Sequence, residues 1–429
     1  MTRTIAAAII AALLFPAAAA ATGARSASLA GAADYLLDDG QVYAWPCRAP
    51  QYYRAVIAEL GVDGTRISDR SSVAGLYSDQ ERTLGVIGLA VNRTTGAQAA
   101  LGDYLDHVYT ADTVSVRANV IERLNQRGLG AGLADIPAPA GGVELLYART
   151  FGDWTPGLRI ERSAARDDET AAGEAREASS SVTGVTLSAS YQPRDALRAD
   201  ASLEYAACSF TSGFTLDASG HSESFTADGA RLAAARARAF YSLNEEMTLV
   251  PRLSLTNTRM GYAYAQSDTG HGAAGSAAAT ELALGIGWQY APTPRYSLIA
   301  GLELGYRSAE TVDSLIAGDP GDVRTTESTL ALPVAHLGLE AQLTRWLTLR
   351  LAGSKRIATT EVVSEFSDQS GRTRKCSSDS YQLGCGLGIR TGGLSLDLAV
   401  NPELLYSGGK LLSDSGTWPV SQASLIYRY

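Results

Sequence analysis

The chain has 429 residues, of which 45% are hydrophobic and 19% are charged, and it contains 43 glycines. Its formal net charge of -9 at pH 7 gives no electrostatic support for a nucleic-acid partner. Its mean hydropathy of -0.03, and the lack of any apolar run of about 20 residues after residue 21, exclude a bundle of membrane-spanning helices.

Residues 1–21 have the pattern of a secretory signal peptide. Arg3 supplies the positive charge, an apolar stretch runs from Ile5 to Phe15, and Pro16 precedes a run of alanines that ends at Ala21. A membrane anchor, which is the alternative, would need a longer apolar span. We therefore expect an exported protein from which residues 1–21 are cleaved.

Residues 22–50 precede the first predicted strand and include Tyr43 and Trp45. We predict that they form an N-terminal arm, which lies either in the periplasm or in the lumen of a barrel. The rest of the chain, residues 51–429, is predicted to form a transmembrane β-barrel with a partly helical insertion at 94–142.

Apolar and polar residues alternate repeatedly from about residue 143 onward. Successive side chains of a strand point to opposite faces, so each such segment has one apolar and one polar face. The predicted strands are 51–61, 70–79, 82–93, 143–152, 155–163, 181–192, 195–207, 230–243, 247–262, 280–291, 295–307, 328–343, 346–358, 380–391, 393–407 and 419–429. They predict an all-β, antiparallel, up-and-down barrel of about 16 strands, with 14 as the runner-up because the three N-terminal patterns are weaker.

The insertion at 94–142 interrupts this alternation. Two of its segments, Gln98 to His107 and Val114 to Arg127, have helical patterns, and Leu129 to Gly142 is rich in Gly, Ala and Pro. The alternating strand directions place both ends of the insertion on the external side. It is predicted either to fold into the lumen as a constriction or plug, or to remain an external loop.

The predicted connections alternate in length along the chain. Short turns, such as 192–195 and 391–393, alternate with long polar stretches at 164–180, 209–229, 265–279, 308–327, 359–379 and 407–418. Short periplasmic turns and long extracellular loops are typical of outer-membrane barrels, whereas a soluble β-sandwich does not sort its loops by end. Aromatic residues near both strand ends, such as Trp288 and Tyr306, fit two interfacial girdles.

The last strand completes the pattern, because Ala423, Leu425, Tyr427 and Tyr429 share one face. Here the sequence resembles the bacterial outer-membrane β-barrel class, in which a terminal aromatic residue commonly ends the last strand, although Tyr429 replaces the commoner Phe. Among large barrels the chain looks most like a porin or a fatty-acid-type transporter, without a specific motif. The resemblance implies location in the outer membrane of a Gram-negative bacterium, contact with its lipid, and recognition of the C-terminal strand by the barrel-assembly machinery.

Charges of both signs lie on the polar face of the predicted strands. An arginine facing lipid at the midplane costs about 2–4 kcal/mol, so we assign these residues to the lumen. The pore-lining candidates are Arg198, Arg236, Arg238, Arg252, Arg350, Arg356, Arg390, Glu204, Glu281, Glu303, Asp397 and Glu403. A barrel of 14 to 16 strands is too wide to be filled by side chains alone, which favours a channel or a plugged transporter over a closed barrel filled by salt bridges.

We expect neither catalysis nor a cofactor or bound metal. Of the four histidines, only His336 lies in a predicted strand, at a point where the alternation slips by one residue and indicates a bulge. Neither a GxSxG motif nor an HxxxH spacing is present. The cysteines are also widely spaced; Cys208 and Cys376 could bridge neighbouring loops, but we expect free thiols.

Three functions are compatible with this sequence. The first is a porin-like outer-membrane channel, through which small solutes pass passively along a mixed-charge lumen. The second is a fatty-acid-transporter-like carrier of apolar ligands, with the insertion or the arm acting as a hatch. The third is a non-conducting envelope protein whose long loops bind a partner. The sequence names neither the solute nor the oligomeric state.

Overall fold

The computed structural model describes residues 23–36, 40–63, 66–78, 84–106, 132–171, 173–216, 218–268, 270, 272–315, 323–365, 371–400 and 420–429. The predicted signal peptide, the predicted helix at Val114 to Arg127, and Glu403 lie outside the described residues.

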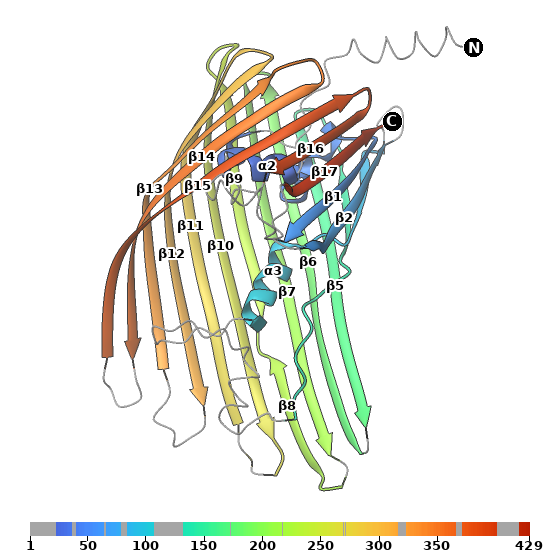
Figure 1. Cartoon of the computed structure of the whole chain (residues 1–429), viewed down its shortest axis with the longest axis vertical. Helices are drawn as coiled ribbons and strands as arrows, with labels where there is room; N and C mark the ends of the chain where they lie inside the picture. Colours follow the sequence, from blue (N-terminus) through green and yellow to red (C-terminus); the bar gives the residue numbers. More distant parts are fainter. Residues whose placement is uncertain are drawn as a thin grey trace, which may run out of the picture.

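One antiparallel sheet closes on itself to form the barrel, because the last strand pairs with the first (Figure 1). Its strands are β1 (Ala55–Asp63), β2 (Arg66–Ser78), β3 (Val86–Val91), β4 (Val143–Ala148), β5 (Trp154–Ala171), β6 (Glu174–Arg194), β7 (Leu197–Leu216), β8 (His221–Ala227), β9 (Arg231–Ser242), β10 (Met247–Gln266), β11 (Gly272–Thr293), β12 (Tyr296–Leu315), β13 (Val323–Gln342), β14 (Leu347–Glu365), β15 (Gly371–Thr391), β16 (Leu394–Val400) and β17 (Val420–Arg428). Both β8 and β9 pair with β7 and β10, so they form one wall strand interrupted at 228–230. The wall in the described residues therefore has 16 strands, which confirms the predicted fold.

In the part of the chain that the structure describes, helical structure is confined to short elements inside this wall. The described helices are α2 (Gly23–Ser28), η1 (Ala32–Tyr35), η2 (Gly40–Tyr43), η3 (Pro46–Gln51) and α3 (Gly96–Asp106). No helix in the described part of the chain is both long and apolar enough to cross a membrane. The α3 helix covers most of the predicted helix at Gln98 to His107.

The strands are longer than the alternation predicts. Most of the polar stretches expected to be long loops are strand, so that β6 begins at Glu174 and β7 continues to Leu216. We call the end of the barrel that holds Tyr429 and the turns 195–196, 294–295 and 392–393 the near end, and the opposite end the far end. Nearly all of the additional strand residues lie towards the far end, where the wall extends well beyond the predicted strands.

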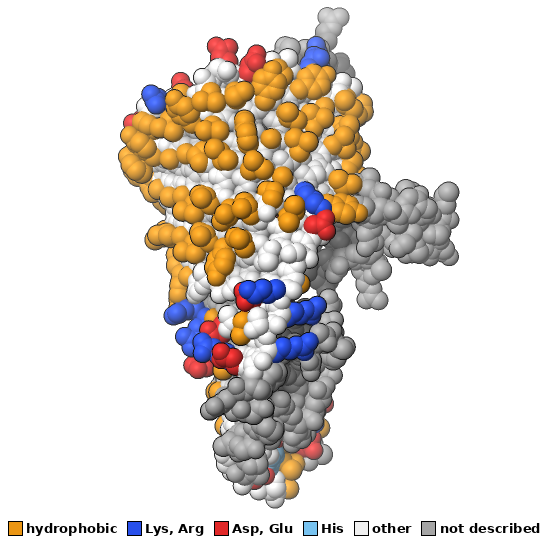
Figure 2. All heavy atoms as spheres, turned by 90° about the vertical axis from the view of Figure 1, so that its left-hand side faces the viewer, with side chains coloured by type: hydrophobic (Ala, Val, Ile, Leu, Met, Phe, Trp, Pro, Cys, Tyr) orange, Lys and Arg blue, Asp and Glu red, His pale blue; other side chains and the backbone are white. Residues whose placement is uncertain are grey.

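The residues on the outer face explain why apolar alternation does not predict these extensions. Outward-facing residues are apolar near the near end and polar beyond it; on β12, for example, Leu302 and Tyr306 are followed by Glu310. From Tyr296 to Tyr306 a strand tilted by about 40° rises about 25 Å, the height of a hydrocarbon-facing band. Figure 2 shows hydrophobic side chains gathered in the upper part of this view and charged ones below them.

The predicted bulge before His336 is confirmed. The register of β13 shifts between Ala331 and Val334 against both β12 and β14. Because the bulge absorbs the slip, Ala331 and Gly338 are both buried on the lumen side.

The edge of the apolar band can be tested with one substitution placed on either side of it. Leu284 is 57% exposed within the band, and Leu284→Arg is expected to destabilise the folded barrel by about 2–4 kcal/mol in lipid. Ala265 faces outward beyond the band, so Ala265→Arg should leave stability within about 0.5 kcal/mol of the unchanged chain. Reversible urea unfolding in vesicles measures both values, and equal costs would contradict the assigned edge.

Candidate functional site in the barrel lumen

The lumen at the near end is occupied by the described part of the N-terminal arm, residues 23–36 and 40–53. Its α2 contacts β14 to β17, η1 contacts β11 to β14, and η3 contacts β3 to β6, so the arm reaches most of the wall (Figure 1). Ala24, Leu29 and Tyr35 are completely buried there. Of the two locations considered for this segment, the structure places it in the lumen.

Apolar side chains anchor two parts of the arm. Leu29, Tyr35 and Leu36 pack with Phe240 and Ile299 on the inner face of the wall. A second cluster joins the end of the arm to the inner faces of β1 to β4 and β17; its members are Val42, Tyr43, Ala49, Tyr52, Ala55, Ile57, Ala74, Leu76, Val86, Ala90, Leu146, Ala148 and Ile426. The inner wall is therefore apolar where these segments of the arm cover it.

Glycines on the inner face let the arm approach the wall closely. A Cβ added at Gly287 or Gly301 would lie 2.3 or 2.4 Å from the ring of Tyr35, a separation at which something must shift. A Cβ added at Gly386 would lie 2.5 Å from the Cβ of Ser28. These positions need glycine because the arm takes the space of a side chain.

A buried charge network joins α2 to the wall. Arg25 Nε donates to Glu340 Oε1 at 2.7 Å, and Arg350 Nε donates to the same oxygen at 2.7 Å. Arg350 also pairs with Asp397, with 2.7 Å between Nη1 and Oδ1, and its side chain is fully buried. The network contains two arginines and two carboxylates, so its charges balance.

Two more pairs join the arm to the opposite wall. Asp34 pairs with Arg252, which also lies 3.2 Å from Glu303. Further along the arm, Arg48 Nε lies 3.6 Å from Asp200 Oδ2, and both side chains are buried. Burial makes such pairs sensitive to the loss of one partner, because the other charge would then be left without compensation.

A third network crosses the wall beside the arm. Arg93 donates to Glu144 at 2.6 and 2.8 Å and lies 3.9 Å from the centre of the Tyr43 ring. Arg159 Nη2 donates to Glu204 at 3.0 Å, and Arg236 donates to the same carboxylate at 2.7 Å. Arg159 also links Glu204 to Glu144, since its Nη1 lies 3.5 Å from that residue.

The predicted pore-lining residues divide into two groups. Those that face the arm or its surroundings at the near end are Arg198, Arg236, Arg238, Arg252, Arg350, Arg390, Glu204, Glu303 and Asp397. The structure joins six of these candidates in three ion pairs: Arg236 with Glu204, Arg252 with Glu303, and Arg350 with Asp397. Arg356 and Glu281 line a separate cavity further along the lumen. Of the near-end residues, Arg238 and Arg252 contact the arm directly, through the Leu36 carbonyl and Asp34.

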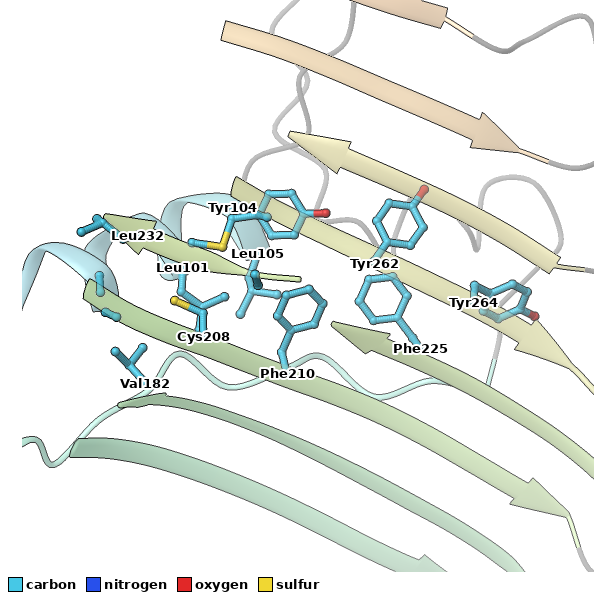
Figure 3. Packing of buried hydrophobic residues seen from close by; sticks show 14 of the residues in the cluster. Leu101, Tyr104, Leu105, Val182, Cys208, Phe210, Phe225, Leu232, Tyr262 and Tyr264 are labelled. Carbon is cyan, nitrogen blue, oxygen red and sulfur yellow. The ribbon is translucent and has the colours of Figure 1, made fainter. Parts of the chain in front are cut away.

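The inner face of the wall becomes apolar towards the far end. On β7 the inward residues Asp200 and Glu204 are followed by Phe210 and Phe214, while the outward residues become polar. Figure 3 shows Leu101 and Tyr104 of α3 near the aromatic side chains of this inner wall, and the Tyr104 and Phe210 ring centres are 5.8 Å apart. The described part of the insertion thus lies against the lumen wall.

Two neighbouring cavities lie in the lumen, and α3 lines one of them. One of about 220 Å³ is bounded by α3 and by small or apolar residues such as Met260 and Ala277. The other, of about 440 Å³, is polar and includes Arg356 and Thr360. Both cavities are lined by Glu281, Arg307 and Glu327. The guanidinium of Arg307 lies 3.1 Å from the carboxylate of Glu281 and 3.3 Å from that of Glu327.

All four cysteines are free, including Cys208 and Cys376. Cys47 is 2% exposed, and burial together with nearby Asp200 raises the pKa of its thiol to about 11. Its backbone nitrogen would lie 2.1 Å from a Cβ added at Gly157. Because a maleimide reacts with an accessible thiolate, Cys47 is a built-in reporter of arm displacement.

Sequence reasoning missed the arm's own contribution to the site, chiefly Arg25, Asp34 and Arg48. A signal was present, because glycines recur on the polar face of predicted strands, as at Gly285 and Gly287. A wide lumen does not require small residues on the inward face of the wall. Glycines on that face therefore indicate that another segment packs against it. The inward phenylalanines were missed because they alternate with Ser and Thr inside an expected loop.

The known proteins similar to this chain share only its architecture. No family model matches the sequence, and no curated protein matches it. Among solved structures, the Pseudomonas putida toluene transporter TodX is 11% identical with a TM-score of 0.36, covering 96% of this chain and 99% of its own. A Pseudomonas aeruginosa FadL homologue is 12% identical with a TM-score of 0.38, covering 95% and 98%. The translocator domain of the Neisseria meningitidis autotransporter NalP is 14% identical with a TM-score of 0.30, covering 65% and 90%.

Proposed function

We propose that this chain is an outer-membrane transport barrel closed at its periplasmic end by its own arm, and that small solutes cross it when the arm moves aside. The main support is the position of the arm, which fills the near end of a 16-strand wall while cavities of about 220 and 440 Å³ lie further along the lumen. A wall of this size would otherwise enclose an aqueous channel.

The apolar band and the chain end give the proposed orientation. The band is about 25 Å high and fits the hydrocarbon layer of a membrane. The near end holds Tyr429 and short turns, so we assign it to the periplasm. The extended far end then projects outside the cell.

The nature of the plug favours gating over a rigid closure. In the described residues the arm joins the wall covalently only where it runs into β1, and its other attachments are ion pairs, hydrogen bonds and packing. Buried ion pairs gain little net free energy over the hydrated, separated partners. The ion pairs therefore add little to the cost of displacing the arm, which is set mainly by its apolar packing. A permanently open passive channel has less support, because the arm fills the near end.

A second candidate function, the carriage of apolar ligands, is favoured by one observation. The inner wall near α3 carries Phe210, Phe225, Met260 and Tyr262, although a lumen for polar solutes needs no aromatic lining. Under this candidate, an apolar solute would pass along α3 before it reaches the arm.

The test compares the mature chain with a variant that lacks residues 23–51, in planar bilayers and in proteoliposomes. The complete chain should be mostly closed, and the truncated one should conduct in large, regular steps, because removing the plug leaves a wide lumen. Heat-modifiable migration on gels verifies that both chains form barrels.

Each outcome of this test separates the proposals. Steps of equal size with and without the arm would overturn gating by the arm. Silence of both chains would support the non-conducting envelope protein. Faster uptake of an apolar dye than of a sugar of the same size by the complete chain would favour the apolar carrier.

A further inference from the structure

The charge networks around the arm differ in their balance. The ion-paired groups of the Arg25 and Glu340 network are two of each sign, with the charge of Arg390 close by, and those of the Arg159 and Glu204 network are three of each sign. Around Asp200, by contrast, three arginines gather: Arg48 from the arm, Arg198 from β7, and Arg238 from β9. This group has an excess of two positive charges.

The geometry of the wall imposes this gathering. Arg198 precedes Asp200 by two residues on the inner face of β7, and Arg238 pairs directly across from Asp200 in the sheet. Arg48 and Arg238 both approach the same carboxylate oxygen, Oδ2, at 3.6 and 3.1 Å. One carboxylate therefore pairs with two guanidinium groups, and the third, that of Arg198, is close enough to interact electrostatically with Asp200 and Arg48.

Several donors of these arginines have no hydrogen-bond partner among the described residues. They are Nε and Nη2 of Arg48, Nη2 of Arg238 and Nε of Arg198. Arg48 is 0% exposed and Arg238 is 5% exposed, so bulk water reaches neither. Buried guanidinium donors that lack an acceptor are costly, and a guanidinium fork matches the geometry of a carboxylate or phosphate.

A cavity adjoins this group. It measures about 270 Å³, lies between the arm and β9 to β10, and is lined by Arg238, Trp45, Gln41, Arg236 and Arg252. Asp34 also lines it, but Asp34 is paired with Arg252. The arginines around the cavity and Asp200 are Arg48, Arg198, Arg236, Arg238 and Arg252, and they still exceed the acids Asp34, Asp200, Glu204 and Glu303.

We propose that Arg48, Arg198 and Arg238 form a binding site for a small oxyanion, phosphate or the carboxylate of a small organic acid, at the contact between the arm and the wall. The bound anion would accept hydrogen bonds from both sides of this contact and so hold the arm in the lumen. This locking role rests on the proposed function, whereas the binding site itself does not.

The test measures how fast maleimide labels Cys47 in the full-length barrel, in a background of Cys208→Ala, Cys376→Ser and Cys385→Ala. Phosphate, acetate and chloride are compared at equal ionic strength. Phosphate or acetate should slow labelling about tenfold relative to chloride at an anion concentration of about ten times its Kd. Which of the two is more effective identifies the class of oxyanion.

Two variants distinguish binding from general attachment of the arm. Arg198→Gln removes a charge of the site without breaking an ion pair of the arm, so the anion effect should be lost. Arg25→Gln is the matched control, because it weakens the arm at a charge-balanced network and should keep the anion effect. Equal labelling in phosphate, acetate and chloride, or an anion effect that survives Arg198→Gln, would overturn the site.

The two proposals can fail separately. If the barrel without residues 23–51 conducts no better than the complete chain while phosphate still slows Cys47 labelling, gating fails and the anion site stands. If conductance depends on the arm but no oxyanion alters labelling, the site fails and gating stands.

Discussion

Replacing Gly287 and Gly301 together by alanine should expel Tyr35 from the wall and release the arm. Each added Cβ would come within about 2.4 Å of the Tyr35 ring, and the ring is completely buried. Overpacking at one position costs about 1–3 kcal/mol, so the pair costs about 2–6 kcal/mol. The labelling rate of Cys47 should rise by about 30-fold to about 10⁴-fold, and channel openings should become frequent.

The ionisation of Tyr35 gives a second measurement of the same event. Burial, followed by the charge of Glu303, raises the pKa of the Tyr35 hydroxyl from 10.0 to about 12. The neutral Tyr35 hydroxyl favours the arm in the lumen. Because its pKa is raised there, this stabilisation is complete below pH 10.0 and is lost as the pH rises through about 12. In the double variant the pKa should fall back towards 10.0, which ultraviolet difference spectra of tyrosinate can follow.

Gly305 provides the control, because it lies on β12 and faces the lumen, as Gly301 does. A Cβ added at Gly305 would meet only the Cβ of Ala331, at an ordinary distance of 3.6 Å. Gly305→Ala should therefore leave both Cys47 labelling and conductance unchanged. If Gly287→Ala with Gly301→Ala labels as slowly as Gly305→Ala, the ring of Tyr35 does not hold the arm as described.

The wall could be predicted from the sequence because the membrane imposes a strict pattern on it. Outward residues such as Leu284 and Leu302 must be apolar within the band, and the inward face must be different, so period-2 alternation marks each crossing. That constraint ends at the edge of the band. Beyond Tyr306 the outer face meets water, the alternation disappears, and the strand continues on backbone hydrogen bonds that leave no comparable trace.

The site could be predicted only in part, for a related reason. The side of the wall on which Arg350 and Asp397 lie follows from alternation, but their partners do not. Glu340 is distant in sequence from Arg25, and no periodicity links a barrel strand to an irregular arm that it encloses. Such contacts depend on the three-dimensional path of the arm. In the sequence, only the inward glycines that accommodate the arm indicate where these contacts lie.

Glu340→Gln should also release the arm, by a different physical route. Glu340 accepts hydrogen bonds from Arg25 and Arg350, whose side chains are 3% and 0% exposed. Removing one partner of a buried ion pair costs about 3–5 kcal/mol, because the remaining charge is left without compensation. Arg25 can escape this cost by leaving the lumen with the arm, whereas Arg350 keeps Asp397 at 2.7 Å. Cys47 labelling should therefore accelerate by about 150-fold to about 4,000-fold while the barrel stays folded.

Two comparisons make this result specific to the buried network. Glu327→Gln alters a carboxylate whose side chain is 34% exposed and whose partner Arg307 does not contact the arm, and a pair of this kind contributes about 0–1 kcal/mol. Its effect on Cys47 labelling should be negligible. Adding Arg25→Gln to Glu340→Gln should change the rate little further, because the first substitution has already broken the shared contact. Fully additive effects of the two substitutions would mean that Arg25 and Glu340 act independently, and the arm would then be held elsewhere.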